Sequence, residues 1–352
     1  MTGAVKYAAV NAKVRGLMGK MLSDEDYRRL INLESVQEIF DYLYNNTFYR
    51  EALTPLAGIE IHRRQLELTL KKSFINDYEV IYRYLTGSTK EFFAYFFAKF
   101  EIEDLKMLLR TILIEHDEEY LRKNLLYLGV HTEDISVNRL TEIKSYQDLL
   151  NVFQDTRYYD TLKRFAERYE KDRNLFPIEM TLDFNYFTEL ARLAGKLSKK
   201  DYKIVRDLLG TQVDLLNIHW VYRIKKYYNL DPEEILNYTL PFHYRLSADD
   251  LRGLARVDDP EEIFNYLKQT RYNTLFSPVA RNKDILFEKY FLSYLLKKAY
   301  RIKVAGTFNI GIISAYLYIK EYEIRDIITI VEGVRYSLES EQIRKYLIRD
   351  WV

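Results

Sequence analysis

Apolar residues recur along much of the chain at the spacing of one face of an α-helix. In two segments they fall at i, i+3, i+4 and i+7, which is the pattern of a helix with a single buried stripe. These stripes are Leu105, Leu108, Leu109 and Ile112 in one segment, and Ile327, Ile330, Val331 and Val334 in the other. A further helix is predicted around residues 5–18. The pattern therefore predicts long helices that each bury one face.

A second pattern predicts pairs of short helices between the long ones. The segment Leu22–Leu30 recurs as Leu246–Leu254, and Glu38–Leu43 recurs as Glu262–Leu267. In both copies a serine stands at a helix N-cap position and an aspartate follows three residues later, as in a capping box. Pro260 lies at the start of the second short helix, where its missing N–H costs nothing. We call this pair of short helices the cap.

A fainter third copy lies in the middle of the chain. Residues 156–158 repeat as residues 270–272, and residues 212–216 lie midway between the matching segments 100–105 and 322–327. With residue 212 aligned to residue 101, the apolar stripe of the middle helix weakens to Leu216, His219, Trp220 and Arg223. Three copies of about 111 residues describe the chain best.

The triplication predicts three helical lobes, at residues 1–125 with the leading helix, 126–240 and 241–352. Each copy leaves apolar surface that a neighbour must cover. The copies therefore either stack as an open solenoid or close around an approximate three-fold axis. Closure would create a central depression that suits a rod-shaped partner.

Composition supports an all-α fold. The chain has 12 Gly and 6 Pro among 352 residues, well below their usual shares of about 7% and 5%. Hydrophobic residues make up 48% and charged residues 30%, which is typical of a soluble globular protein. The predicted fold class is all-α, with three similar lobes in approximate three-fold pseudo-symmetry.

Charge and motif content exclude several functions. The 53 basic and 52 acidic residues nearly cancel, so a nucleic-acid partner is not expected. No phosphate-binding glycine loop is present, and there are no cysteines. None of the histidines forms a metal-binding pair; they are His62, His116, His131, His219 and His243. We predict no catalytic residue, no cofactor, no metal site and no small-molecule substrate.

Both ends of the chain carry a family resemblance. The segment Tyr7–Leu17, YAAVNAKVRGL, and the segment Tyr316–Ile327, YLYIKEYEIRDI, followed by Glu332–Tyr336, resemble the C subunit of the V/A-type ATPases, a family related to the eukaryotic d subunit. The resemblance implies a funnel of three helical lobes that turns with the rotor and transmits torque. Its partners would be the shaft subunits D and F and the membrane ring of proteolipid subunits (K, or c).

The resemblance also implies a non-catalytic subunit at the cytoplasmic face of the membrane, as a peripheral part of the complex. The longest apolar stretch, Ile310–Ile319, is about half of the ~20 residues that a membrane span needs. Transport of protons or sodium and ATP chemistry would belong to other subunits.

Repeated polar positions on the predicted long helices are candidates for the partner interface. They are Glu101, Asp104, Glu323, Arg325 and Asp326. The alternative for each is a role inside the fold, as a helix cap or in an ion pair between lobes.

Two other functions compete with the rotary role. A general helical-repeat scaffold that binds some other protein would present an open groove and would not bind a D–F shaft. A helical enzyme would need a convergent polar pocket, which the sequence does not indicate.

Overall fold

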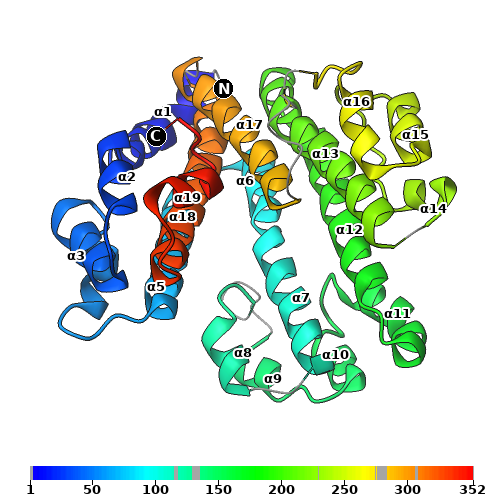
Figure 1. The fold of residues 1–352 in the computed structure, drawn as a ribbon, viewed down its shortest axis with the longest axis horizontal. Coiled ribbons are helices and arrows are strands. Elements are labelled where there is room, and N and C mark those ends of the chain that lie inside the picture. The colour runs from blue at the N-terminus through cyan, green and yellow to red at the C-terminus, as the bar shows by residue number, and fades with distance from the viewer. Residues whose placement is uncertain are drawn as a thin grey trace. The chain divides into compact units, whose positions relative to one another are not determined.

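The computed structural model is built from helices throughout the part of the chain that it describes (Figure 1). It describes residues 3–114, 118–128, 135–228, 230–273, 275, 284–305 and 308–351. The predicted all-α class is confirmed. Pseudo-symmetry among three lobes stays a prediction.

The chain divides into two compact units. Unit 1 combines Met1–Leu85 with Leu197–Val352, and unit 2 is Thr86–Lys196. The division at residues 125 and 240 was predicted from the sequence repeats. It stays a prediction about where one repeated lobe ends and the next begins.

Unit 2 is built around two long helices, α7 and α12. Helix α12 packs against both α6 and α7, and aromatic side chains fill the space between them: Phe92 and Phe93 of α6 and Tyr186 of α12 are buried. The helices of this unit are α6 (Gly87–Phe96), α7 (Ala98–Ile114), α8 (Glu118–Asn124), α9 (Val137–Thr141), α10 (Tyr146–Val152), α11 (Tyr159–Asp172) and α12 (Phe176–Ala194).

Unit 1 is organised around α18, which packs against α1, α5, α13 and α17. The predicted leading helix is present as α1. Helices from the first part of the chain are α1 (Gly3–Met18), α2 (Asp24–Ile31), α3 (Val36–Asn46), α4 (Arg50–Leu53), η1 (Thr54–Leu56) and α5 (Arg63–Tyr82). Those from the second part are α13 (Lys199–Tyr227), α14 (Pro232–Asn237), α15 (Ala248–Arg256), η2 (Pro260–Glu262), α16 (Ile263–Leu267), α17 (Asp284–Ala305), α18 (Gly311–Arg335) and α19 (Ser340–Tyr346).

All three predicted caps are present as pairs of short helices. They are α2 with α3, α9 with α10, and α15 with η2 and α16. Ser23 and Ser247 begin the first helix of their caps through reciprocal capping boxes with Asp26 and Asp250, as the sequence predicts. In the middle cap the complete box has moved to the second helix, where Ser145 starts α10.

Candidate functional site: buried carboxylates on the long helices

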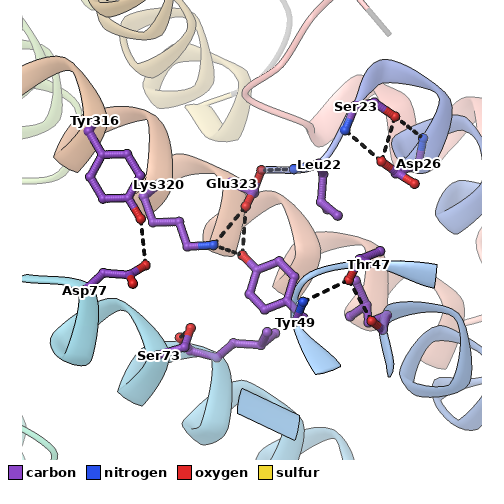
Figure 2. Close-up of polar contacts among 12 residues, drawn as sticks. Leu22, Ser23, Asp26, Thr47, Tyr49, Ser73, Asp77, Tyr316, Lys320 and Glu323 are labelled. Carbon is purple, nitrogen blue, oxygen red and sulfur yellow. Dashed lines mark hydrogen bonds and ion pairs between the residues drawn. The ribbon is translucent and has the colours of Figure 1, made fainter. Parts of the chain in front are cut away.

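Two carboxylates of α18 bind segments from the first and last parts of the chain, and Figure 2 shows the contacts of one of them, Glu323. Glu323 accepts hydrogen bonds from the backbone N–H of Leu22 and from the hydroxyl of Tyr49, both at 2.8 Å. Lys320, one turn earlier, places its ammonium 3.1 Å from the same carboxylate and 2.6 Å from the Tyr49 hydroxyl. The first cap is therefore fixed to α18 through a buried, charge-assisted network.

Asp326, one turn further along α18, binds the end of the chain. It accepts from the backbone N–H groups of Ile348, at 2.6 Å, and Arg349, at 3.1 Å. The Arg349 side chain returns to the first cap, where it donates to Asp24 at 3.1 Å and lies over the Tyr27 ring at 4.3 Å. The C-terminal segment is thus held between α18 and the first cap.

Helix α7 repeats this arrangement in unit 2. Asp104 accepts from three successive backbone N–H groups, those of Leu126, Tyr127 and Leu128, at 2.7–3.0 Å. Glu101, one turn earlier, accepts from the Tyr158 hydroxyl at 2.6 Å and from the Arg157 guanidinium at 3.2 Å. The cap that follows α7 in the chain is therefore bound to α7.

Helix α13 carries a third version with one carboxylate. Asp214 accepts from the backbone N–H groups of Tyr244, Arg245 and Leu246, at 2.7–3.3 Å, and from the Tyr272 hydroxyl at 2.7 Å. Buried Thr211 stands one turn earlier, at the place that Glu101 holds on α7. Because a threonine side chain is too short and uncharged to bind the cap tyrosine in the same way, Asp214 binds both the returning backbone and the tyrosine.

The tyrosines that bind Glu323, Glu101 and Asp214 come from one repeated turn. Tyr49, Tyr158 and Tyr272 each donate their backbone N–H to the hydroxyl of a threonine two residues earlier, at 3.1–3.3 Å. Each threonine hydroxyl donates in turn to a carbonyl at the end of the cap. This Thr-x-Tyr turn ends the cap and directs the tyrosine towards the long helix.

Burial controls the protonation of these groups. Loss of water raises the pKa of Asp104 to about 6, although three backbone N–H groups favour its ionised form. Burial also raises the pKa of Asp326 to about 7, against the donors at Ile348 and Arg349. The pKa of Asp214 is raised for the same reason.

Four of the five predicted interface residues lie inside the fold. Glu101, Asp104, Glu323 and Asp326 are buried, with the intramolecular partners described above. Arg325 is the exception: its side chain is 42% exposed and lies 3.7 Å from Glu288. The four carboxylates thus make the contacts inside the fold that were the alternative to an interface role. Their contact with a partner protein stays a prediction.

The sequence comparison missed Asp214 because its register was wrong by one residue. Aligning Thr211, instead of Gln212, with Glu101 places Asp214 opposite Asp104. In that register Leu215 and Ile218 continue the stripe, and both are buried, whereas Arg223 of the predicted stripe is exposed. The first Thr-x-Tyr turn was missed as well, because Phe48 replaces the arginine of the other two.

Nothing in the described residues gathers side chains for metal chemistry. No group of three or more His, Asp or Glu side chains suitable for a metal ion occurs there, while His116 and His131 lie outside the described residues. None of the helices in the described ranges combines the length and apolar character of a membrane span. The carboxylates bind backbone N–H groups, tyrosine hydroxyls and the basic side chains of Lys320 and Arg157.

The fold and its carboxylate contacts define an all-helical protein made of repeated caps and long helices. A model of the family described as ATP synthase (C/AC39) subunit matches residues 10–346. The chain belongs to this family.

Proteins similar to this chain include C subunits of archaeal ATP synthases. The chain is 26% identical to the C subunit of the A-type ATP synthase of Methanocaldococcus jannaschii, over 97% of this chain and 86% of that protein. It is 25% identical to the corresponding A-type ATP synthase C subunit of Methanosarcina mazei, over 98% of this chain and 94% of that protein. It is 24% identical to that of Methanosphaera stadtmanae, over 97% and 88%. The resemblance noted in the sequence is confirmed.

Proposed function

We propose that this chain is the non-catalytic connector in the central stalk of a rotary V/A-type ATPase. It would join the D–F shaft to the membrane ring of proteolipid subunits and transmit torque between ATP chemistry and the transport of protons or sodium. Membership of the ATP synthase subunit family supports a place for this chain in such a complex. The chain would lie at the cytoplasmic face of the membrane as a peripheral component.

The observation that carries the proposal is the attachment of both chain ends to α18. A connector under torque must resist displacement of one repeat against the next. Glu323 and Asp326 join the first cap and the C-terminal segment to one helix through buried hydrogen bonds. Since buried charge-assisted hydrogen bonds require close geometry, these contacts resist shear better than a flexible linker would.

Arg325 is the predicted interface residue best placed to meet the shaft. Its exposed guanidinium forms a long ion pair with Glu288, at 3.7 Å, on the molecular surface. Electrostatic complementarity at such rim positions mainly sets association rate and specificity. We propose that Arg325 contacts an acidic group of the D–F shaft.

A pull-down of the full chain with recombinant D–F tests the connector role. The wild-type chain should bind D–F, and Arg325→Glu should weaken binding by about tenfold, with a smaller effect at high salt. Arg344→Glu is a matched control, because Arg344 is 37% exposed and lies 3.7 Å from Glu341. Absence of wild-type binding would favour the general helical-repeat scaffold.

The carboxylates need a separate test. If Asp104 and Asp326 also face the shaft, replacing both with Ala should weaken D–F binding in a variant that remains folded. Unchanged affinity would restrict these residues to their internal contacts.

A further inference from the structure

One end of unit 1 brings together the starts of α1, α13 and α18 with the last turn of α17. Asp201, in the first turn of α13, accepts from the Tyr7 hydroxyl of α1 at 2.8 Å and from the backbone N–H of Ile310 at 3.2 Å. A Cβ built on Gly311 would lie 2.9 Å from Ile302 of α17. These contacts fix the four helix ends next to one another.

This end is strongly basic, although the chain as a whole has a formal charge of only +1. We call it the basic end; its basic side chains are Lys6, Lys199, Lys200, Lys203, Arg206, Arg301 and Lys303. The one acid in the same helix ends is Asp201, which is buried and occupied by internal donors. Asp207, the next acid of α13, pairs with Lys298 at 2.7 Å.

Three lysines of the basic end are directed to solvent, whereas Lys6 lies 4.0 Å from Asp201. Lys199, Lys200 and Lys203 are exposed, and among the described residues none of these three forms an ion pair. Their positive charge is therefore available to an external anion. The N-terminus of α13 adds the positive end of a helix dipole at the same place.

Large apolar side chains project between the basic ones. Val304 is 85% exposed, Val5 66%, Phe308 48% and Tyr202 38%. The basic end thus combines a dense positive charge with exposed apolar side chains.

This combination favours a lipid surface over a protein surface. Protein interfaces are depleted in lysine and concentrate their apolar groups in a dry centre. Anionic membrane surfaces instead attract clusters of Lys and Arg, and apolar side chains enter the headgroup layer beside them. Five of the seven basic residues here are lysines.

We propose that the basic end binds the anionic phospholipid headgroups of a membrane surface, with Val304 and Phe308 entering the headgroup layer. The inference concerns a direct lipid contact and goes beyond the connector role. It is independent of binding to the D–F shaft, so either proposal can fail while the other stands.

Flotation of the full chain with lipid vesicles tests the proposal. The chain should bind vesicles of phosphatidylcholine mixed with phosphatidylglycerol, should bind phosphatidylcholine alone far less, and should be released by salt. Each basic residue at an anionic surface contributes about fivefold in binding. The triple variant Lys199→Glu, Lys200→Glu, Lys203→Glu should therefore lose at least about a hundredfold.

A matched control lies on α11 of unit 2. Lys163, Arg164 and Lys171 are also exposed and on one helix, so changing all three to Glu alters net charge equally and should leave vesicle binding close to wild type. Val304→Ser tests the apolar contribution without changing charge and should weaken binding by roughly fivefold. Helical circular dichroism of each variant checks that it is folded.

Three results would overturn the proposal. The first is equal binding to the two kinds of vesicle. The second is an equal loss in the two triple variants, which would show an effect of net charge alone. The third is binding to an isolated proteolipid ring in detergent with no binding to vesicles, which would assign the basic end to a protein partner.

Discussion

A buried carboxylate loses the water that stabilises its charge, so it needs several protein donors in place of that water. Asp104 and Asp214 each receive three successive backbone N–H groups. These N–H groups belong to segments between helices, where no helical carbonyl is available to them. One aspartate therefore satisfies its own charge and the backbone of a returning segment together.

The hydroxyl of each cap tyrosine should contribute more than an ordinary buried hydroxyl, because its acceptor is charged. Tyr158→Phe removes a donor to Glu101 at 2.6 Å, and Tyr146→Phe removes a donor to the Leu162 carbonyl at 2.7 Å. Both tyrosines are buried in unit 2. The free energy of unfolding should fall by about 1.5–3 kcal/mol in the first variant and by about 0.5–1.5 kcal/mol in the second. Urea unfolding measures both, and equal losses would contradict the role of the charge.

Asp326 should make stability depend on pH. Its pKa is about 7 in the folded chain, raised by burial from an ordinary value of 3.8. Between about pH 4 and pH 7 the folded chain therefore binds more protons than the unfolded chain, and stability falls as pH rises across this window. Asp326→Asn removes this titration. Between about pH 4 and about pH 7.5 the free energy of unfolding should therefore decline less in the variant than in wild type, and the two declines should differ by up to about 4 kcal/mol.

Asp104→Asn provides the comparison for this pH effect, because the pKa of Asp104 is raised only to about 6. Asp104→Asn should also remove part of the decline in the free energy of unfolding with rising pH. That part should end about one pH unit lower than the part that Asp326→Asn removes. Parallel stability profiles for wild type and Asp326→Asn would rule out a raised pKa at residue 326.

At the scale of single elements, the caps were the part that the sequence predicted best. A serine hydroxyl and an aspartate three residues apart make a local contact, so their pattern survives in the sequence: Ser23 and Asp26 form the box that it indicates. Contacts between a long helix and a distant segment leave no such pattern. Asp326 binds residues more than twenty positions away, and nothing in the local sequence around it names those residues.

The same difference explains the error on α13. The middle stripe is interrupted by polar residues, so the apolar period alone could not choose between two registers one residue apart. Asp214 and its backbone partners decide the register, because the geometry of three N–H donors admits one position on the helix.

The packing of α19 on α18 depends on Gly333. A Cβ at this position would lie 2.6 Å from Cγ1 of Ile343, which is too close for any real contact. Gly333→Ala should therefore displace α19 and lower the free energy of unfolding by about 1–3 kcal/mol, despite the better helix propensity of alanine. Thermal unfolding measures this change.

Gly16 of α1 is the control for this prediction. A Cβ there would meet nothing within 4 Å, so Gly16→Ala should raise the free energy of unfolding by up to about 1 kcal/mol. Stabilisation by both substitutions would mean that α19 does not pack closely at Gly333.

At the scale of the whole molecule, a prediction concerns which pieces of the chain can fold alone. Unit 2, Thr86–Lys196, keeps α7 together with both segments that its carboxylates bind. The sequence-predicted lobe 126–240 separates Tyr127 and Tyr158 from α7. The fragment 86–196 should show helical circular dichroism and a cooperative thermal transition, whereas 126–240 should unfold without one. Cooperative unfolding of 126–240 would favour the boundaries that the repeats suggested.

Helices α7 and α13 each bind the cap that follows them in the chain, and α18 binds the first cap. Open repeat arrays need specialised end units to cover their exposed faces. Here the first cap covers part of α18. In unit 1 the polypeptide therefore loops back on itself, because residues more than 270 positions apart in the sequence meet at α18.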